Sequence, residues 1–194
     1  MDKIKARVMK QDMIGTDIYS LEIRAAFIAE CAKPGQFVAL YSKDGAKILP
    51  RPISICETHS DEGTIRLVYR IAGEGTREFS ELKMGDYIEV MGPLGNGFRM
   101  ENNRKAILIG GGIGIPPMLE LAKQLDCDKS VILGYRDEIF MAEDFESRAD
   151  VYMASEDGKH GVQGNVINAI EEYDIQGDII YACGPTPMLR AIKE

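Results

Sequence analysis

The chain has 194 residues, of which 45% are hydrophobic and 28% are charged, and its net charge is −8. These values are typical of a globular protein with enough length for one large or two small domains around buried cores. The negative charge would repel a phosphate backbone and the basic residues form no patch, so we expect no nucleic-acid partner. No apolar run is long enough to cross a bilayer and the first residues hold no apolar signal core, so we expect a cytoplasmic protein with no membrane partner.

The four cysteines stand far apart in the sequence and include no C-x-x-C pair. They are Cys31, Cys56, Cys127 and Cys183. A metal site built from them would need long-range convergence that the spacing does not suggest, so we predict no metal ligands. A disulfide framework is not expected in a cytoplasmic chain of this size, which leaves free thiols, either buried or reactive.

Short strands dominate the first hundred residues, because apolar and polar residues alternate in runs that glycine or proline turns separate. The predicted strands are Ala6–Met9, Tyr19–Ile23, Gly35–Leu40, Ser54–Cys56, Thr64–Ile71 and Tyr87–Val90. One helix is expected among them, at about residues 76–82. Many short strands at this spacing favour a small antiparallel β-barrel, and residues 1–100 are predicted to form this first domain.

The stretch Arg51-Pro52-Ile53-Ser54 in this region has the chemistry of a flavin site. An arginine presents a permanently charged planar fork to a diphosphate, and a proline holds its neighbour in an extended conformation. The serine can then come within hydrogen-bond distance of a redox ring. The same residues are also compatible with a surface arginine ahead of an edge strand.

A second stretch, Gly73-Glu74-Gly75-Thr76, lies where a strand gives way to the expected helix. Glycines allow close approach to an anion, the first turn of a helix has unpaired amides, and the threonine adds a hydroxyl donor. The stretch is therefore a candidate phosphate site. It is also consistent with a glycine turn in which Thr76 is an ordinary helix cap.

The pattern changes after Arg104, where strands begin to alternate with helices. The predicted strands are nearly continuous apolar runs at Lys105–Ile109, Ser130–Gly134, Val151–Ala154 and Asp178–Ala182. Helices are expected at Pro116–Gln124, Ala142–Arg148, Asn165–Tyr173 and from Met188 onward. This alternation predicts a parallel, Rossmann-like α/β sheet covered on both faces, and residues 101–194 are predicted to form this second domain.

Two glycine-containing loops follow strands of the second domain. Gly110–Pro117 joins a strand to a helix as a dinucleotide-binding fingerprint does, with a proline in place of the third glycine, and proline is tolerated in the first turn of a helix. Cys183-Gly184-Pro185 follows the last strand, at the edge where open parallel sheets bind ligands. Cys183 can also be a small buried core residue.

In this order, the four stretches R-P-x-S, G-x-G-T, G-x-G-x-x-P and C-G-P resemble those of the ferredoxin-NADP reductase family, over nearly the whole chain. In that family a β-barrel holds the flavin and an α/β domain holds the nicotinamide nucleotide. Four stretches are similar, more closely, to the electron-transfer subunits of bacterial two-component, NAD-linked dihydroorotate dehydrogenases. These stretches are Leu67–Arg70, Gly110–Glu120, Ile132–Arg136 and Tyr181–Leu189.

The resemblance implies a role for each matching residue. Arg51 would bind the FAD diphosphate, with Gly75 and Thr76 completing that site. Ser54 would lie near the flavin nitrogen that accepts hydride, and Cys183 would lie beside the nicotinamide, so these two are the candidate catalytic residues. The other flavin contacts would come from Pro52, Ile53 and the backbone of Leu67, Val68, Tyr69 and Arg70. The other nicotinamide nucleotide contacts would come from Gly112, Gly114, Ile115 and Gly184.

The chain departs from the family pattern in two places. Ile53 stands where many relatives have an aromatic residue that stacks on the flavin ring. The family's [2Fe-2S] cluster is held by a cysteine-rich segment beyond the C-G-P helix, whereas this chain stops at Glu194 and has no four-cysteine ligand set. We therefore expect a truncated chain with FAD and NAD as its cofactors, the alternatives being a divergent gene or an activity confined to exchange between nicotinamide and flavin.

The acidic turn Ser155-Glu156-Asp157-Gly158 bears on the choice of nucleotide. NADP-using relatives tend to have a serine followed by arginine here, whereas this chain has two acids, which can accept hydrogen bonds from ribose hydroxyls and repel a phosphate dianion. Glu156 and Asp157 therefore predict NAD. Arg136 is the contrary feature, and a solvated acidic turn is the alternative.

The resemblance implies a flavin-dependent NAD(H) oxidoreductase. It would be the subunit of a hetero-oligomer that passes electrons between a catalytic dihydroorotate dehydrogenase subunit and NAD(H) in pyrimidine biosynthesis. The rival within the enzymes is a ferredoxin- or sulfide-linked NAD(P)H reductase subunit. The rival from another class is a non-catalytic docking module that binds FAD or a nucleotide.

Overall fold

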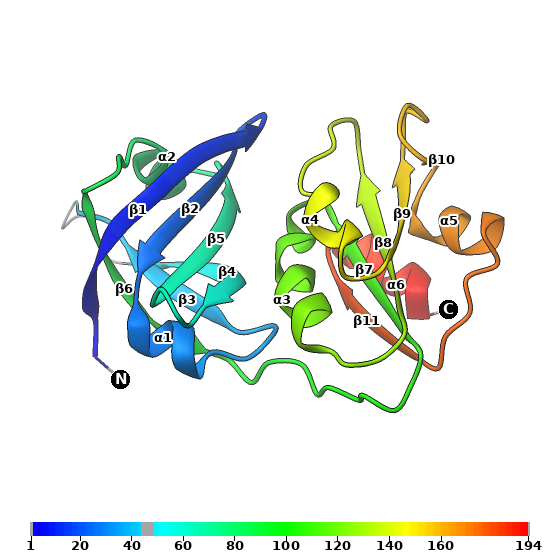
Figure 1. The fold of residues 1–194 in the computed structure, drawn as a ribbon. Coiled ribbons are helices and arrows are strands. Elements are labelled where there is room, and N and C mark those ends of the chain that lie inside the picture. The colour runs from blue at the N-terminus through cyan, green and yellow to red at the C-terminus, as the bar shows by residue number, and fades with distance from the viewer. Residues whose placement is uncertain (1, 44–48, 194) are drawn as a thin grey trace. The chain divides into compact units, whose positions relative to one another are not determined.

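A computed structural model describes residues 2–43 and 49–193 of the chain (Figure 1). The chain divides into two compact units, Met1–Gly97 and Phe98–Glu194. None of the helices in the described ranges combines the length and the apolar composition needed to cross a membrane.

The first unit is a closed barrel of six antiparallel strands, as the sequence predicts. The strands are β1 (Ile4–Gly15), β2 (Ile18–Arg24), β3 (Phe37–Tyr41), β4 (Arg51–His59), β5 (Thr64–Arg70) and β6 (Tyr87–Leu94). Their order around the barrel is β1-β2-β5-β4-β3-β6. Successive side chains of a strand point to opposite faces, so β5 places Ile65, Leu67 and Tyr69 together in the core.

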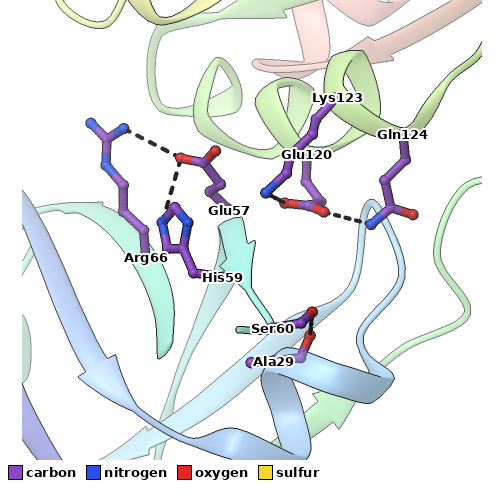
Figure 2. A network of polar contacts seen from close by, with 8 residues as sticks. All are labelled: Ala29, Glu57, His59, Ser60, Arg66, Glu120, Lys123 and Gln124. Atoms are coloured by element: carbon purple, nitrogen blue, oxygen red, sulfur yellow. Dashed lines mark hydrogen bonds and ion pairs between the residues drawn. The ribbon is translucent and has the colours of Figure 1, made fainter. Parts of the chain in front are cut away.

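Two short helices lie among these strands, α1 (Ala26–Cys31) and α2 (Glu74–Ser80). The prediction of a single helix is therefore wrong. Ala25 offers no side-chain cap to α1 and the first turn of α1 holds no acidic residue, so the usual start signals are missing from the sequence. A residue outside the helix contributes to its stability instead. The Ser60 hydroxyl donates a 3.1 Å hydrogen bond to the Ala29 carbonyl (Figure 2).

The second unit is a five-stranded parallel sheet in the order β10-β9-β8-β7-β11, which confirms the predicted α/β class. The strands are β7 (Ala106–Gly111), β8 (Lys129–Tyr135), β9 (Asp150–Ser155), β10 (Val162–Gln163) and β11 (Ile179–Cys183). The helices are the 3-10 turn η1 (Gly112–Gly114), α3 (Pro116–Gln124), α4 (Glu143–Glu146), α5 (Val166–Glu172) and α6 (Thr186–Lys193). The helices α5 and α6 cover one face of the sheet and α3 lies on the other (Figure 1).

Each unit contains a polar cluster built around a glutamate (Figure 2). In α3 the Glu120 side chain is almost completely buried, accepts a hydrogen bond from Gln124 and lies 4.0 Å from the Lys123 ammonium. A buried charge is costly unless it is paired, so these donors from the next turn compensate the burial of Glu120. In the barrel, Arg66 of β5 lies 4.0 Å from Glu57 of β4 and links the two strands.

The last residues of the first unit, up to Gly97, are held by the barrel. The Gln36 side-chain amide donates a 2.7 Å hydrogen bond to the Gly95 carbonyl. A Cβ on Gly97, whose φ is +74°, would lie 2.9 Å from the Pro34 carbonyl oxygen. The last residues of the first unit are therefore packed onto the barrel.

The first residues of the second unit, from Phe98 onward, are held by β11. The Tyr181 hydroxyl of β11 donates to the Arg99 carbonyl at 3.0 Å and accepts the Glu101 N–H at 2.9 Å. The Phe98 ring makes an edge contact with the Tyr181 ring, with centroids 5.8 Å apart. The hydroxyl of this buried tyrosine is thus used both as a donor and as an acceptor, and these two hydrogen bonds fix the start of the second unit.

Candidate functional site

Strand β4 carries the predicted flavin stretch Arg51–Ser54. It pairs with β3 throughout this stretch, but its ladder with β5 begins only at Ile55. Within the described residues, the other backbone edge of Arg51–Ser54 therefore has no pairing to β5. Pro52, which has no N–H to donate, fits such a position. The stretch belongs to an inner strand of a closed barrel and still has one edge that a ligand can use.

The structure brings Arg51 and Gly75 together, although they lie on β4 and α2. A Cβ added to Gly75 would lie 2.6 Å from Nε and 2.9 Å from Cζ of Arg51, so the guanidinium packs directly on the glycine backbone. Arg51 also donates through Nη1 to the Leu49 carbonyl. A planar cation fixed over the first turn of a helix is the arrangement expected at a diphosphate site.

The Thr76 hydroxyl is used inside the turn that starts α2. Its oxygen accepts the N–H groups of Ala72 at 2.8 Å and Gly73 at 3.2 Å, and its hydrogen is donated to the Gly73 carbonyl at 3.1 Å. One donor and two lone pairs are all that a hydroxyl offers. In this structure Thr76 therefore shapes the start of the helix, as a cap does.

The stretch Leu67–Arg70 of β5 presents mainly its backbone. Leu67 and Tyr69 point into the barrel core, Val68 is buried, and Arg70 is exposed. Burial raises the pKa of the Tyr69 hydroxyl well above its usual value, so this phenol stays neutral. Any contact of Leu67 and Tyr69 with a flavin would therefore be made by main-chain atoms.

Ile53 and Ser54 point to opposite faces of β4 because they are successive strand residues. Ile53 packs against the barrel core. Ser54 is half-buried, so its hydroxyl lies at the surface of the barrel and not within it.

The glycine fingerprint of the second unit lies at the carboxyl end of β7, where η1 leads into α3. A Cβ on Gly114 would lie 2.3 Å from the Cys183 carbonyl oxygen and 2.7 Å from the Gly184 Cα. Gly114 is therefore needed for the fingerprint loop to close on the loop after β11. Gly112 differs, because its φ is +51° and a Cβ there would meet no described atom within 4 Å. The fingerprint combines one glycine required by packing with one that leaves open space.

Cys183 ends β11 beside Gly110 of β7 and is half-buried. Burial raises the pKa of its thiol, so the thiol remains protonated at neutral pH. A neutral, polarizable thiol is suited to contact with an uncharged ring and is a poor nucleophile. The structure thus brings Gly114, Cys183 and Gly184 to one edge of the sheet.

The acidic turn after β9 contains a cation that the sequence analysis missed. The Lys159 ammonium lies 3.0 Å from the Asp157 carboxylate, which also accepts the Lys159 backbone N–H at 3.1 Å. The backbone hydrogen bond and then the ammonium lower the pKa of Asp157. Glu156 is exposed and its N–H donates to the Tyr135 carbonyl. Because Lys159 offsets one acidic charge, Glu156 is the stronger candidate for rejecting an additional phosphate.

In the ranges 2–43 and 49–193, no group of three or more histidine, cysteine, aspartate or glutamate side chains is arranged to hold a metal ion. Among the described residues the four cysteines form no disulfide, and Cys31 is exposed whereas Cys56 is buried.

Comparison with known proteins adds sequence relatives. A family model described as the oxidoreductase FAD-binding domain matches residues 5–98. The dihydroorotate dehydrogenase B (NAD(+)) electron transfer subunit of Bacillus cereus (strain B4264) is 39% identical over 203 residues, which cover 100% of this chain and 78% of that protein. The protein of the same name from Bacillus anthracis (strain CDC 684 / NRRL 3495) is also 39% identical, with the same coverage.

Solved structures show the same architecture. An NADH-dependent reduced ferredoxin-NADP oxidoreductase is similar with a TM-score of 0.87 and 30% identity, over 96% of this chain and 70% of that chain. The ferredoxin reductase in carbazole 1,9a-dioxygenase has a TM-score of 0.80 at 22% identity, over 98% of this chain and 63% of that chain. The second comparison shows the fold alone.

Proposed function

Because the chain belongs to the family of dihydroorotate dehydrogenase B (NAD(+)) electron transfer subunits, we propose that it uses bound FAD to pass electrons between a dihydroorotate dehydrogenase partner and NAD(H). The observation that carries the proposal is the packing of the Arg51 guanidinium on Gly75. Two stretches of the region matched by the FAD-binding domain meet there as a cationic cradle. A diphosphate is the ligand that such a cradle fits.

Bound FAD would supply the two-electron exchange with NADH and the onward transfer of electrons. The protein's own residues bind and orient the reacting groups. Arg51 would offset one of the two negative charges of the diphosphate, and the Ser54 hydroxyl would donate a hydrogen bond to the flavin ring. The unpaired edge of β4 keeps these groups accessible to the ligand.

The nicotinamide nucleotide would rest on the fingerprint loop of the second unit. Gly112 leaves space there for a phosphate, and Ile115 at the start of α3 is completely buried and fixes the loop. Cys183 and Gly184 contact the nicotinamide, with the thiol neutral. Glu156 and, more weakly, Asp157 bind the ribose hydroxyls of NAD.

The proposed assembly is a cytoplasmic hetero-oligomer with a catalytic dihydroorotate dehydrogenase subunit, serving pyrimidine biosynthesis. A [2Fe-2S] cluster does not fit the described residues, because the four cysteines do not converge as a ligand set. The proposed activity of these residues is the exchange between NADH and flavin.

The test is the visible spectrum of the purified protein, followed by anaerobic addition of NADH. We expect about one FAD per chain and bleaching of the flavin band. A chain that binds no flavin would overturn the proposal, and bound flavin that NADH does not bleach would indicate the docking module. The 30% identical ferredoxin-linked structure favours one rival, a ferredoxin-linked reductase, and faster electron transfer to ferredoxin than to the dihydroorotate dehydrogenase partner would select it.

Replacement of Ser54 by alanine should slow flavin reduction by NADH about tenfold while FAD stays bound, because one hydrogen bond to the developing charge is lost. Anaerobic stopped-flow bleaching at saturating NADH measures this rate. The matched control is Ser60→Ala, which removes a hydroxyl bonded to the Ala29 carbonyl in the same barrel. Equal rates in the Ser54 variant and the wild type would remove Ser54 from the site.

Replacement of Glu156 by arginine should raise the rate with NADPH relative to NADH about tenfold, because a repelling carboxylate becomes a fork that binds phosphate. The starting protein should prefer NADH. Glu172→Arg makes the same charge change on the exposed surface of α5 and serves as the control. A starting preference for NADPH, or the same shift in both variants, would contradict the assignment of Glu156.

A further inference from the structure

Helix α2 carries Gly75 of the proposed diphosphate site, yet it has only seven residues, Glu74–Ser80. A helix of two turns is not stable by itself, so its position must come from tertiary contacts. The Arg51 guanidinium packs so closely on Gly75 that a Cβ would not fit between them. The packing of Arg51 on the first turn of α2 therefore depends on the contacts that hold the rest of the helix in place.

Gln11 of β1 holds the other end of this helix. Its side-chain Nε2 donates to the Phe79 carbonyl at 3.0 Å and to the Leu82 carbonyl at 3.0 Å. Phe79 lies in the last turn of α2 and Leu82 lies two residues beyond its end, so one amide group ties both carbonyls of this C-terminal region to β1. The Gln11 Oε1 accepts a 3.3 Å hydrogen bond from the Tyr69 hydroxyl, so the amide is used on both sides.

Aromatic packing completes this attachment. Phe79 of α2 is 2% exposed and makes an edge contact with Tyr69, with centroids 6.3 Å apart and an interplanar angle of 87°. Tyr69 in turn stacks on Tyr19 at 5.9 Å. The end of α2 is thus fixed to β1 through the hydrogen bonds of Gln11 and to β5 through the contact of Phe79 with Tyr69.

We propose that Gln11 is a positioning residue for FAD, acting through α2 from the end opposite the diphosphate. This inference rests on the proposed function. The helix is short and its first turn is in tight contact with Arg51, so a shift at Phe79 and Leu82 is transmitted to Gly75. Gln11 contacts the side chain of Tyr69, a residue assigned to the flavin only through its backbone, so the contribution of Gln11 lies in keeping the cradle in shape.

Three substitutions separate the donor and acceptor functions of Gln11. Gln11→Met removes both, and Gln11→Glu keeps an acceptor for Tyr69 but places a negative charge against the helix carbonyls. Gln11→Lys keeps donors for both carbonyls and loses the acceptor. We expect FAD to bind about tenfold more weakly in the methionine variant, weaker still in the glutamate variant, and close to wild type in the lysine variant.

The experiment is a titration of flavin-free protein with FAD, followed by flavin fluorescence, at a temperature where circular dichroism shows each variant folded. Gln36→Met is the matched control, because this glutamine also donates to a backbone carbonyl of the barrel, that of Gly95, and it does not touch α2. The control should bind FAD as the wild type does even if its unfolding temperature falls.

The proposed function and the role of Gln11 fail in different ways. A wild-type protein without affinity for FAD would overturn the proposed function. Wild-type affinity that Arg51→Ala abolishes, together with unchanged affinity in the methionine and glutamate variants, would overturn only the role of Gln11. Equal weakening in the Gln11 and Gln36 variants, or a lysine variant as weak as the methionine variant, would also overturn it. If the glutamate variant does not fold, the comparison of methionine with lysine decides.

Discussion

Replacement of Arg51 by alanine is expected to weaken FAD binding about 100-fold, because charge-assisted hydrogen bonds to a diphosphate are among the strongest that a side chain makes. The structure adds a second reason, since Arg51 also fills the space above Gly75. Its removal leaves the first turn of α2 without the group that packs on it. The measurement is flavin content per chain after gel filtration, followed by titration with FAD.

Two variants calibrate this result. Thr76→Ala should release less FAD than Arg51→Ala, because the Thr76 hydroxyl is used within its own turn. Arg24→Ala removes an exposed arginine at the end of β2 and should retain the flavin. Full retention of FAD by the Arg51 variant would remove this residue from the proposed site.

The second large effect is expected from Gly114→Ala, which should destabilise the second unit by roughly 3 kcal/mol. The new Cβ would lie 2.3 Å from the Cys183 carbonyl oxygen and 2.5 Å from its carbonyl carbon. These are backbone atoms of a strand end, so no rotation of a side chain relieves the overlap and the two loops must separate. Reduction by NADH should be lost while FAD remains bound to the barrel.

Gly112→Ala is the control for the stability part of this prediction. Its φ of +51° makes an alanine unfavourable by about 1 kcal/mol, but the described structure leaves open space for the methyl group. Thermal unfolding followed by circular dichroism compares the two variants. Equal unfolding temperatures for Gly114→Ala and the wild type would show that the two loops do not pack as described.

The sequence predicted the elements whose signals are local. The bounds of α3 agree with the prediction at both ends, because prolines mark its start and an apolar period continues to Gln124. The strand β10 has two residues, and α1 lacks caps, so neither leaves a pattern long enough to recognise. Element type was therefore predictable where periodicity or capping was present.

The contacts among the proposed site residues could not be predicted from the sequence. The four motifs name Arg51, Gly75, Gly114 and Cys183, yet the packing of the first pair and of the second pair depends on the tertiary fold. Lys159 pairs with Asp157 across Gly158, whose φ of +69° reverses the chain. The sequence interpretation considered only the acidic residues of that turn and therefore missed this ion pair.

Gln11 is the residue that sequence reasoning had least chance to find. It is a single glutamine in an alternating strand, and its partners lie 68 and 71 positions away, in the last turn of α2 and just beyond its end. No spacing rule connects them.

The packing of the chain on both sides of the boundary between Gly97 and Phe98 has a kinetic consequence. Gly97 is packed onto the barrel and Phe98 onto the Tyr181 ring, so a single peptide bond separates the two attachment points. A tether this short gives each unit an effective concentration around the other that is far above that of the protein in solution. Electron exchange between the FAD and the nicotinamide nucleotide proposed to bind these units should therefore be first order in protein and insensitive to dilution, and a flexible insertion between Gly97 and Phe98 should slow it as the tether lengthens.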